Sequence, residues 1–242
     1  MIDTHCHIDL YSHPEMLLKE CEQYDLTVLA MTNLPSHFEI GYEHVLPFKK
    51  IRLALGMHPL YAEQHEKEIQ LFYRNLPKTS YIGEVGLDFS REGYSTKDVQ
   101  VRTFEKILKK IEGQKKLLSI HSRRAEKEVL QMLLNYQIPA AIFHWYSGPV
   151  SLIDKIVDAG YYFSINPMMT QSESGRKIID RIPQANLLTE TDGPFSTVDG
   201  RPTKPFDVVI VYQYFSKIWG ANIDEIGMII SSNFKTLLLN IK

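Results

Sequence analysis

The sequence contains few cysteines and no long hydrophobic run. Only Cys6 and Cys21 occur among 242 residues, which is too few for a disulfide framework and typical of a reducing compartment. No stretch approaches the roughly 18 consecutive apolar residues that a membrane span requires. The first residues lack a charged start followed by an apolar run, so we expect no signal peptide. Together these absences predict a cytoplasmic protein that does not contact a membrane.

An excess of positive charge is also absent. The formal net charge is −2, from 27 Lys and Arg against 29 Asp and Glu. A protein that coats nucleic acid through charge alone would be strongly basic. A nucleic-acid substrate would therefore need local positive charge, from bound metal ions and a few arginines. The hydrophobic fraction of 44% is ordinary for a globular protein.

Short apolar runs alternate with helical segments along the chain. The predicted strands are residues 1–7, 26–31, 51–55, 81–85, 117–121, 140–144, 161–165 and 186–191. Between them, apolar residues recur three and four positions apart, as on the buried face of a helix. The predicted closing helices are 207–219 and 223–239. Eight strands that alternate with helices predict an α/β fold, a TIM-like parallel (β/α)8 barrel.

One domain is expected for residues 1–242, because single barrels of this kind run to about 250 residues. The chain contains no Ser/Gly-rich linker, internal repeat or low-complexity tract. The longest irregular stretch, residues 192–205, contains three prolines and two glycines and follows the eighth predicted strand. Barrel enzymes place binding loops at this end of the strands.

Histidines and carboxylates stand at the predicted ends of five strands. They are His5 and His7 in the first, Glu84 in the fourth, His121 in the fifth, His144 in the sixth and Asp192 after the eighth. Residues i and i+2 of a strand face the same side, so His5 and His7 should present both imidazoles together. Cys6 between them should face the core. Any of the six taken alone could be a core, capping or loop residue, but their shared position at one barrel rim favours a metal site.

This ligand set suits the hydrolysis of a phosphodiester. Two divalent ions about 3.5–4 Å apart neutralise the phosphate and lower the pKa of a bound water. Glu84 lies between the two histidine groups in the sequence, so we predict that it bridges the ions. Asp192 is predicted to bind one ion and to orient or deprotonate the attacking water. Histidine-rich ligation suits Zn, Mn, Co or Ni better than an oxygen-only Mg site.

Five residues are candidates for substrate contact. His58 ends the third strand and could contact a phosphate or support a ligand, or could be a plain loop residue. The guanidinium groups of Arg123 and Arg201 could hold a phosphate, or could be surface charges. Trp145 and Tyr146 could stack an unpaired base, worth about 1–3 kcal/mol per base, or could pack at the rim.

Several other polar residues have weaker assignments. Asp88, just past the fourth strand, is a candidate to orient a ligand, and Glu190 could support Asp192 from one layer deeper. The remaining histidines, which lie on helical or loop segments, are expected at the surface. They are His13, His37, His44 and His65.

Six motifs in the chain resemble those of the TatD-family metal-dependent deoxyribonucleases. They are Asp3–His7, Gly56–Pro59, Ile82–Asp88, His121–Arg123, His144–Gly148 and Thr189–Pro194, and they occur in family order. The resemblance implies a barrel of the metallo-dependent hydrolase type and a two-metal hydrolase, typically a 3′-to-5′ exonuclease on DNA, often supported by Mg. It implies that His5, His7, Glu84 and Asp192 bind one metal and that Glu84, His121 and His144 bind the second.

A narrower resemblance concerns residues 145–148, 189–195 and 199–202. They are similar to the TatD-like nuclease of the Qat anti-phage defence system, which implies a bacterial setting with protein partners. The sequence departs from the family at Trp145, where a cysteine is usual, at Arg201–Pro205, where an Asn-x-Pro is usual, and at Ile107, where a glutamine is usual in the fourth helix. These departures affect the substrate pocket and leave the ligands intact.

Three function classes remain open. A metal-dependent deoxyribonuclease is favoured. A small-molecule hydrolase of the amidohydrolase type is the second, although many of those enzymes bridge their metals with a modified lysine where Glu84 stands. A partner-gated or non-catalytic subunit of a defence complex is the third, and the intact ligand set argues only against loss of chemistry.

Overall fold

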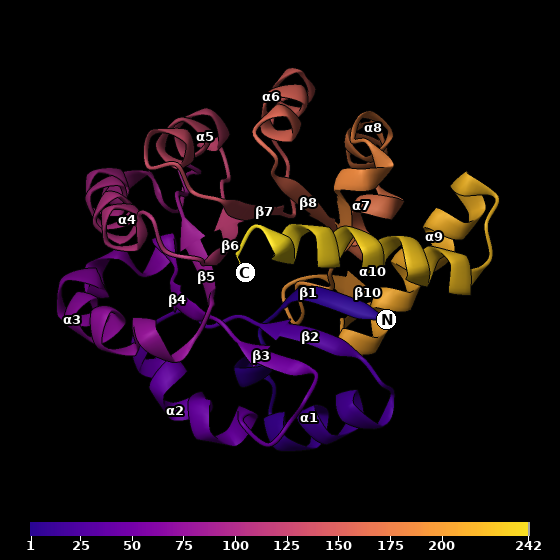
Figure 1. The fold of residues 1–242 in the computed structure, drawn as a ribbon, viewed down its shortest axis with the longest axis horizontal. Helices are drawn as coiled ribbons and strands as arrows, with labels where there is room; N and C mark the ends of the chain where they lie inside the picture. Colours follow the sequence, from indigo (N-terminus) through magenta and orange to yellow (C-terminus); the bar gives the residue numbers. More distant parts are fainter. Residues whose placement is uncertain (242) are drawn as a thin grey trace.

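Parallel strands form a closed ring, and the helices surround it (Figure 1). The structure is a computed structural model and describes residues 1–241. The strands of the ring are β1 (Ile2–Cys6), β2 (Thr27–Ala30), β3 (Ile51–Leu53), β4 (Leu55–Met57), β5 (Tyr81–Gly86), β6 (Leu117–His121), β7 (Ala140–His144), β8 (Tyr162–Ile165) and β9 (Leu187–Thr189). The predicted TIM-like barrel is confirmed.

Most of the helices lie between consecutive strands, on the outside of the ring. They are α1 (Pro14–Gln23), α2 (Pro35–Val45), α3 (His65–Asn75), α4 (Lys97–Ile111), α5 (Glu126–Asn135), α6 (Ile153–Asp158), α7 (Pro167–Gln171) and α8 (Glu173–Arg181). After the last strand come α9 (Val209–Trp219) and α10 (Ile223–Leu239). No helix in the described part of the chain is long and apolar enough to cross a lipid bilayer.

The third predicted strand is interrupted, so eight predicted strands appear as nine segments. β3 and β4 flank Ala54, whose N–H donates to the Ala30 carbonyl over 2.8 Å. β3 belongs to the sheet β1-β2-β3, and β4 begins the parallel sheet that runs in order to β9. At Gly56 in β4, an added Cβ would lie 1.6 Å from the carbonyl oxygen of Thr32, which follows β2, so this close approach requires glycine. The interrupted strand joins the two sheets into one ring.

β9 and β1 close the ring through individual hydrogen bonds instead of a strand ladder. The Thr189 hydroxyl donates to the Ile2 carbonyl over 2.6 Å. Just beyond the strand ends, the Asp192 N–H donates to the His5 carbonyl over 2.8 Å. Further bonds of this kind join Thr4 to Thr189 and His7 to Gly193. This seam connects the first residues of the chain to the loop that follows β9.

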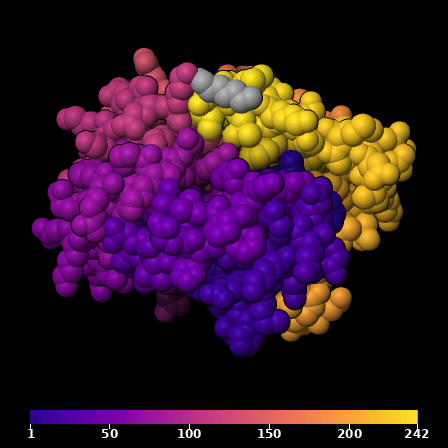
Figure 2. Space-filling view, turned by 60° about the horizontal axis from the view of Figure 1, so that its bottom comes forward, coloured from indigo at the N-terminus to yellow at the C-terminus, as the bar shows by residue number. Residues whose placement is uncertain are grey.

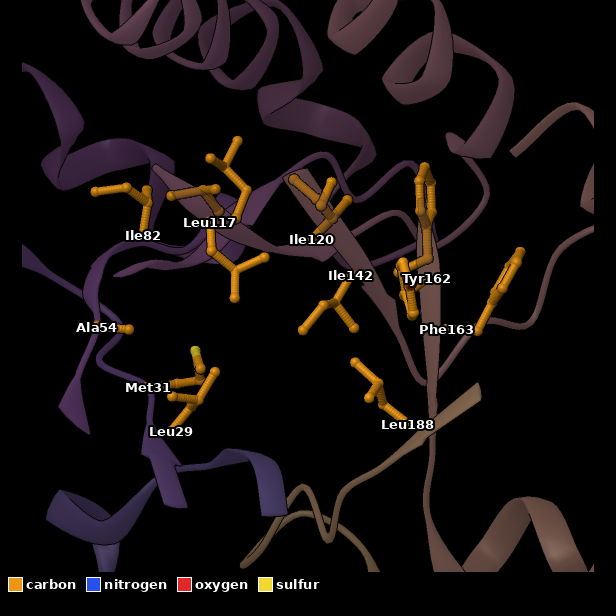
Figure 3. Packing of buried hydrophobic residues seen from close by; sticks show 14 of the residues in the cluster. Leu29, Met31, Ala54, Ile82, Leu117, Ile120, Ile142, Tyr162, Phe163 and Leu188 are labelled. Atoms are coloured by element: carbon orange, nitrogen blue, oxygen red, sulfur yellow. The ribbon is translucent and has the colours of Figure 1, made fainter. Parts of the chain in front are cut away.

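Apolar side chains fill the inside of the ring beneath the C-terminal ends of the strands. Leu29, Met31, Ile142 and Leu188 point toward one another there, and each is at most 2% exposed (Figure 3). Phe163 points away from them, toward the surrounding helices (Figure 3). Inward and outward side chains alternate along each strand. Each strand therefore stabilises the interior and the helix layer with its two faces.

The helix α10 lies across the end of the ring at which the strands begin (Figure 1). Asn233 donates to the carbonyls of Gln184 and Leu187 over 2.7 and 2.9 Å, where the chain enters β9. The helix begins at a capping box, in which the side chains of Asn222 and Glu225 each accept the other's backbone N–H, over 2.9 and 2.8 Å. This end of the barrel is therefore covered.

The two closing helices follow the sequence prediction closely. Helix α10 coincides with the predicted range 223–239. The predicted range 207–219 begins in a 3-10 turn, Pro205–Val208, and continues as α9. Gly220, with φ +65°, ends α9 in the left-handed conformation that glycine adopts readily.

The loop after β9, predicted to be irregular, contains a short hairpin. β10 (Thr197–Val198) pairs in an antiparallel manner with β11 (Arg201–Pro202). The two residues between them, Asp199 and Gly200, have φ values of 50° and 75°, as tight hairpin turns require. The orange surface of this region lies beside the indigo N-terminal residues (Figure 2). The loop is therefore an ordered part of the barrel rim.

Candidate metal centre

The structure brings the six predicted ligand residues together at the C-terminal ends of the strands. Their positions follow from the barrel, because parallel strands end at one rim. The residues are His5 on β1, His7 just after it, Glu84 on β5, His121 at the end of β6, His144 at the end of β7 and Asp192 after β9. All are buried except His121, whose side chain is 15% exposed. The placement agrees with the expectation that was based on strand ends.

One carboxylate oxygen of Glu84 faces the histidines of the first strand. Glu84 Oε2 lies 3.1 Å from His7 Nε2 and 3.5 Å from His5 Nε2. Asp192 Oδ1 approaches the same imidazoles, at 3.5 Å from His5 Nε2 and 3.8 Å from His7 Nε2. Two imidazoles and two carboxylates therefore surround one position.

The other oxygen of Glu84 faces a second group of imidazoles. Glu84 Oε1 lies 2.6 Å from His121 Nδ1 and 2.7 Å from His144 Nε2. His58 also joins this group, with Nε2 at 3.3 Å from the same oxygen. The rings of His5 and His144 stack with centroids 3.9 Å apart, so the two groups are contiguous.

These residues fit divalent cations. Three sets of donor atoms each lie within 4.8 Å of one another: His5, His7 and Glu84; His5, His144 and Asp192; and His58, Glu84 and His121. The Nε2 atoms of His5 and His7 approach to 3.2 Å and point to the same carboxylates. Imidazole nitrogens and carboxylate oxygens are the donors of zinc and other transition-metal sites.

Burial lowers the pKa of three imidazoles at the site. It lowers the pKa of His5 well below the ordinary value, and the nearby His144 adds to the effect. Burial also lowers the pKa of His58 and of His144, against the opposing pull of the Glu84 carboxylate. Neutral imidazoles keep the lone pairs that metal ligation requires.

The pKa values of the two carboxylates shift in opposite directions. Burial alone would raise the pKa of Glu84, but the surrounding imidazoles, His58 and His144 first, hold it well below its usual range. Burial and then the charge of Glu84 raise the pKa of Asp192 well above its usual range. A second buried anion beside the first is unfavourable without positive charge. A cation next to Asp192 would remove this conflict.

Two side chains orient the imidazoles from behind. Asp88 Oδ2 lies 2.8 Å from His121 Nε2, and Ser119 Oγ lies 2.7 Å from His5 Nδ1. Burial would lower the pKa of His121, but its bonds to Asp88 and Glu84 raise it to about 9. Such contacts fix the ring orientation and leave the other nitrogen facing the site. Asp88 thus occupies the position expected for an orienting residue.

Sequence reasoning missed Ser119. It lies two residues before His121 on β6 and therefore faces the inside of the ring, and strand parity alone could have identified it. Gln100 on α4 was also missed. Its amide oxygen accepts the Asp88 N–H over 2.8 Å, and nothing in the helical pattern marked it.

Glu190 lies one layer below the imidazoles and is fully buried. Its Oε1 accepts the Trp145 N–H over 2.9 Å, and its Oε2 accepts the Ser164 hydroxyl. Trp145 has a φ of +36°, which is unusual for a residue other than glycine. Glu190 therefore supports the turn after His144, and its Oε1 lies 3.9 Å from His144 Nδ1.

A cleft of about 720 Å³ opens over the ligand residues. It is lined by Asn33, His58, Leu60, Tyr61, Glu84, Glu92, His121, Ser122, Arg123, His144, Trp145, Ser147, Asp192 and Phe195. Three predicted substrate-contact residues, His58, Arg123 and Trp145, are among them. The apolar side chains Leu60, Tyr61 and Phe195 were not predicted.

Two predicted substrate contacts are corrected by the structure. Tyr146 is 1% exposed, and its hydroxyl donates to the Pro149 carbonyl over 2.8 Å. The positive φ of Trp145 turns the chain so that Tyr146 enters the helix layer instead of the rim. Arg201 does not line the cleft, because Asp207 accepts two bonds from its guanidinium, at 2.7 and 2.8 Å.

One predicted surface histidine is also corrected. His65 is 2% exposed, and its Nε2 donates to the His58 carbonyl over 2.9 Å. It begins α3 beneath the turn that carries His58, so it supports that turn from inside. His13 and His44 are exposed, as expected, and His37 is half-buried.

Known proteins resemble the chain over nearly its whole length. A family model described as TatD related DNase matches residues 2–239. A metal-dependent hydrolase of Methanocaldococcus jannaschii is 28% identical over 243 residues, which cover 96% of this chain and 94% of the relative. Human deoxyribonuclease TATDN3 is 23% identical over 256 residues, covering 96% and 92%.

A solved structure shows the same fold. The crystal structure of YjjV, a TatD homologue from Escherichia coli, superimposes with a TM-score of 0.87. The two chains are 24% identical, and the superposition covers 98% of this chain and 97% of the other. The family match spans every position at which a metal ligand was predicted.

Proposed function

The chain belongs to the TatD-related DNase family of metal-dependent hydrolases, and from this premise we propose that it hydrolyses phosphodiester bonds of DNA at a two-metal site. The observation that carries the proposal is the position of Glu84. Its Oε2 faces His7 at 3.1 Å and its Oε1 faces His144 at 2.7 Å. A carboxylate whose two oxygens face separate imidazole groups is suited to bridge two cations.

We assign the ligands by these two faces. His5, His7, Asp192 and Glu84 Oε2 would hold one cation. His121, His144 and Glu84 Oε1 would hold the other, and His58 lies on this side with the cleft in front of it. The cations, when bound, would neutralise the charge of the phosphate and lower the pKa of water at the site.

The protein's own groups would orient the substrate and accept the proton. Asp192 lines the cleft, and we assign its carboxylate the proton of the attacking water. Arg123 would hold phosphate oxygens, since its side chain is 54% exposed and only loosely paired with Glu92 at 3.5 Å. The buried seam between β1 and β9 keeps Asp192 facing His5 while this proton moves.

We further propose that the enzyme works at strand ends, in the 3′-to-5′ direction that the family resemblance implies. Among the residues that line the cleft, Arg123 is the single Lys or Arg. A strand gripped along many phosphates would need several cationic side chains. A partner-gated role in a bacterial defence complex is a separate proposal, supported by the resemblance of residues 145–148, 189–195 and 199–202 to the Qat nuclease.

Digestion of end-labelled DNA tests the proposal. Single- and double-stranded DNA labelled at the 3′ or the 5′ end would be incubated with Mg, Mn, Zn, Co or Ni, with RNA and p-nitrophenyl esters alongside. We expect metal-dependent release of nucleotides from single-stranded 3′ ends. Hydrolysis of the esters with the polymers untouched would replace the nuclease by a small-molecule hydrolase.

A further inference from the structure

Phe195 is an exposed aromatic side chain on the wall of the cleft. It is 54% exposed, whereas the next residue, Ser196, is fully buried and Asp192 is 4% exposed. Phenylalanine usually loses its contact with water when a chain folds. A large apolar ring held in the mouth of a polar site therefore points to a ligand surface.

The exposure of Phe195 does not come from a loose backbone. Its N–H donates to the Asp192 carbonyl over 2.9 Å. The Ser196 and Thr203 hydroxyls lie 2.7 Å apart, and the Thr203 N–H donates to the Ser196 carbonyl over 3.0 Å. Tyr11, from the N-terminal segment, donates to the Thr203 carbonyl. The ring is therefore presented by a segment that is fastened on both sides.

The ring lies directly beside the ligand residues. Its centroid is 5.1 Å from that of His7, at an interplanar angle of 83°. His7 in turn lies 3.1 Å from Glu84. On the other side of Glu84, Tyr61 stands edge-on to His58, with centroids 5.9 Å apart. Aromatic rings thus flank the candidate metal centre next to both imidazole groups.

We propose that Phe195 is the stacking platform for an unpaired nucleobase of the nucleotide next to the scissile phosphate. The inference rests on the proposed nuclease function and adds to it a residue that selects the substrate. Stacking on an aromatic ring is sequence-tolerant because every base has a π-face. A base within a duplex offers no free face, so Phe195 would favour ends that are already unpaired.

The test compares two substrates that differ only in the base. One single-stranded oligonucleotide carries normal 3′-terminal nucleotides, and its partner carries abasic ones. On the normal strand, Phe195→Ala should lower kcat/KM by about 5- to 150-fold, the range expected for one stacked base. On the abasic strand it should cause no further loss. Phe195→Trp should keep the activity, and Phe195→Leu should lose part of it.

A matched control separates this role from a general effect of exposed rings. Tyr94 is 58% exposed and does not line the cleft, so Tyr94→Ala should leave both substrates unaffected. An equal loss on normal and abasic strands with Phe195→Ala would mean a structural role and would overturn the proposal. So would an unchanged rate on both.

A binding measurement distinguishes this inference from the nuclease proposal. Fluorescence anisotropy with phosphorothioate versions of the two strands should show Phe195→Ala weakening only the strand that carries bases. If the wild-type protein cuts no DNA yet shows this base-dependent binding, the nuclease proposal fails and the stacking platform stands. If binding is the same with and without the terminal bases, the stacking role of Phe195 is contradicted, whether or not the protein cuts DNA.

Discussion

The two ends of the barrel differ although the same strands build both. Toward one end, inward positions carry Leu29, Ile142 and Leu188, and α10 covers the opening. Toward the other end of the barrel, the inward positions of the strands carry side chains that can ionise. On β7, for example, Ile142 is followed two residues later by His144. Burying ionisable groups is costly unless they are paired or bind a cation. The apolar end therefore supplies the stability against which the reactive end can be assembled.

The largest expected effect on activity comes from removing Glu84, the carboxylate that lies between the two imidazole groups. Glu84→Ala should lower metal-dependent kcat/KM by at least about 10³-fold, roughly 4 kcal/mol, because the two oxygens of Glu84 lie closest to the two imidazole groups, at 3.1 Å from His7 and 2.7 Å from His144. The fold should persist, since the apolar end is untouched. Steady-state kinetics and a circular dichroism melt would measure both. Cleavage at the wild-type rate would end the bridging role of Glu84.

The converse change at the apolar end should affect stability. Ile142→Ala removes a fully buried side chain inside the ring and should lower the free energy of unfolding by about 2–5 kcal/mol. Urea denaturation would measure it. Ile40→Ala, at a position that is 73% exposed, is the control and should stay within about 0.5 kcal/mol. Equal effects of the two would contradict the assignment of the interior as the stabilising core.

A smaller effect should follow from loosening one imidazole. Asp88→Ala leaves His121 Nε2 without its partner and should weaken metal binding by about 10- to 100-fold. Asp88→Asn keeps an oxygen that can accept this bond and removes only the charge, so it should lie between Asp88→Ala and the wild type. Calorimetric titration with Mn or Zn would measure the affinities. Identical affinities in all three proteins would show that Asp88 does not orient the ligand.

The smallest expected effect is on the stability that α10 contributes where it covers the apolar end of the barrel. Asn233→Ala removes two hydrogen bonds between α10 and the start of β9 and should cost about 1 kcal/mol of stability. Asn240→Ala, at the exposed end of the same helix, is its control. The test is the difference between the two midpoints of urea denaturation. A larger loss of stability from Asn240→Ala than from Asn233→Ala would mean that α10 is fixed to the barrel mainly through its C-terminal end.

The barrel and the meeting of the candidate ligand residues at its rim were predictable for the same reason. Strands with period-two alternation, separated by helical stretches, specify a parallel ring, and a parallel ring brings all strand ends to one rim. His5, Glu84 and His144 are far apart in the sequence but are brought together by this rule. Their chemistry did not need to be known for their positions to be expected.

What escaped prediction depends on local backbone turns and on partners from other elements. The positive φ at Trp145 decides that Tyr146 faces the helices, and no periodicity signals it. Arg201 is paired with Asp207, six residues away in a loop where no regular spacing applies. Phe195 was overlooked because an aromatic residue in a loop is equally compatible with burial and with exposure, and only the anchored hairpin beside it decides.

The seam between β1 and β9 joins two segments that are synthesised at very different times. His5 and His7 are synthesised well before Asp192 and before the strand that closes against β1. A chain that ends before Leu187 lacks both the closing strand and Asp192, one of the two carboxylates. Such a chain cannot form the full set of candidate ligand residues, so the candidate metal centre is completed only late in synthesis.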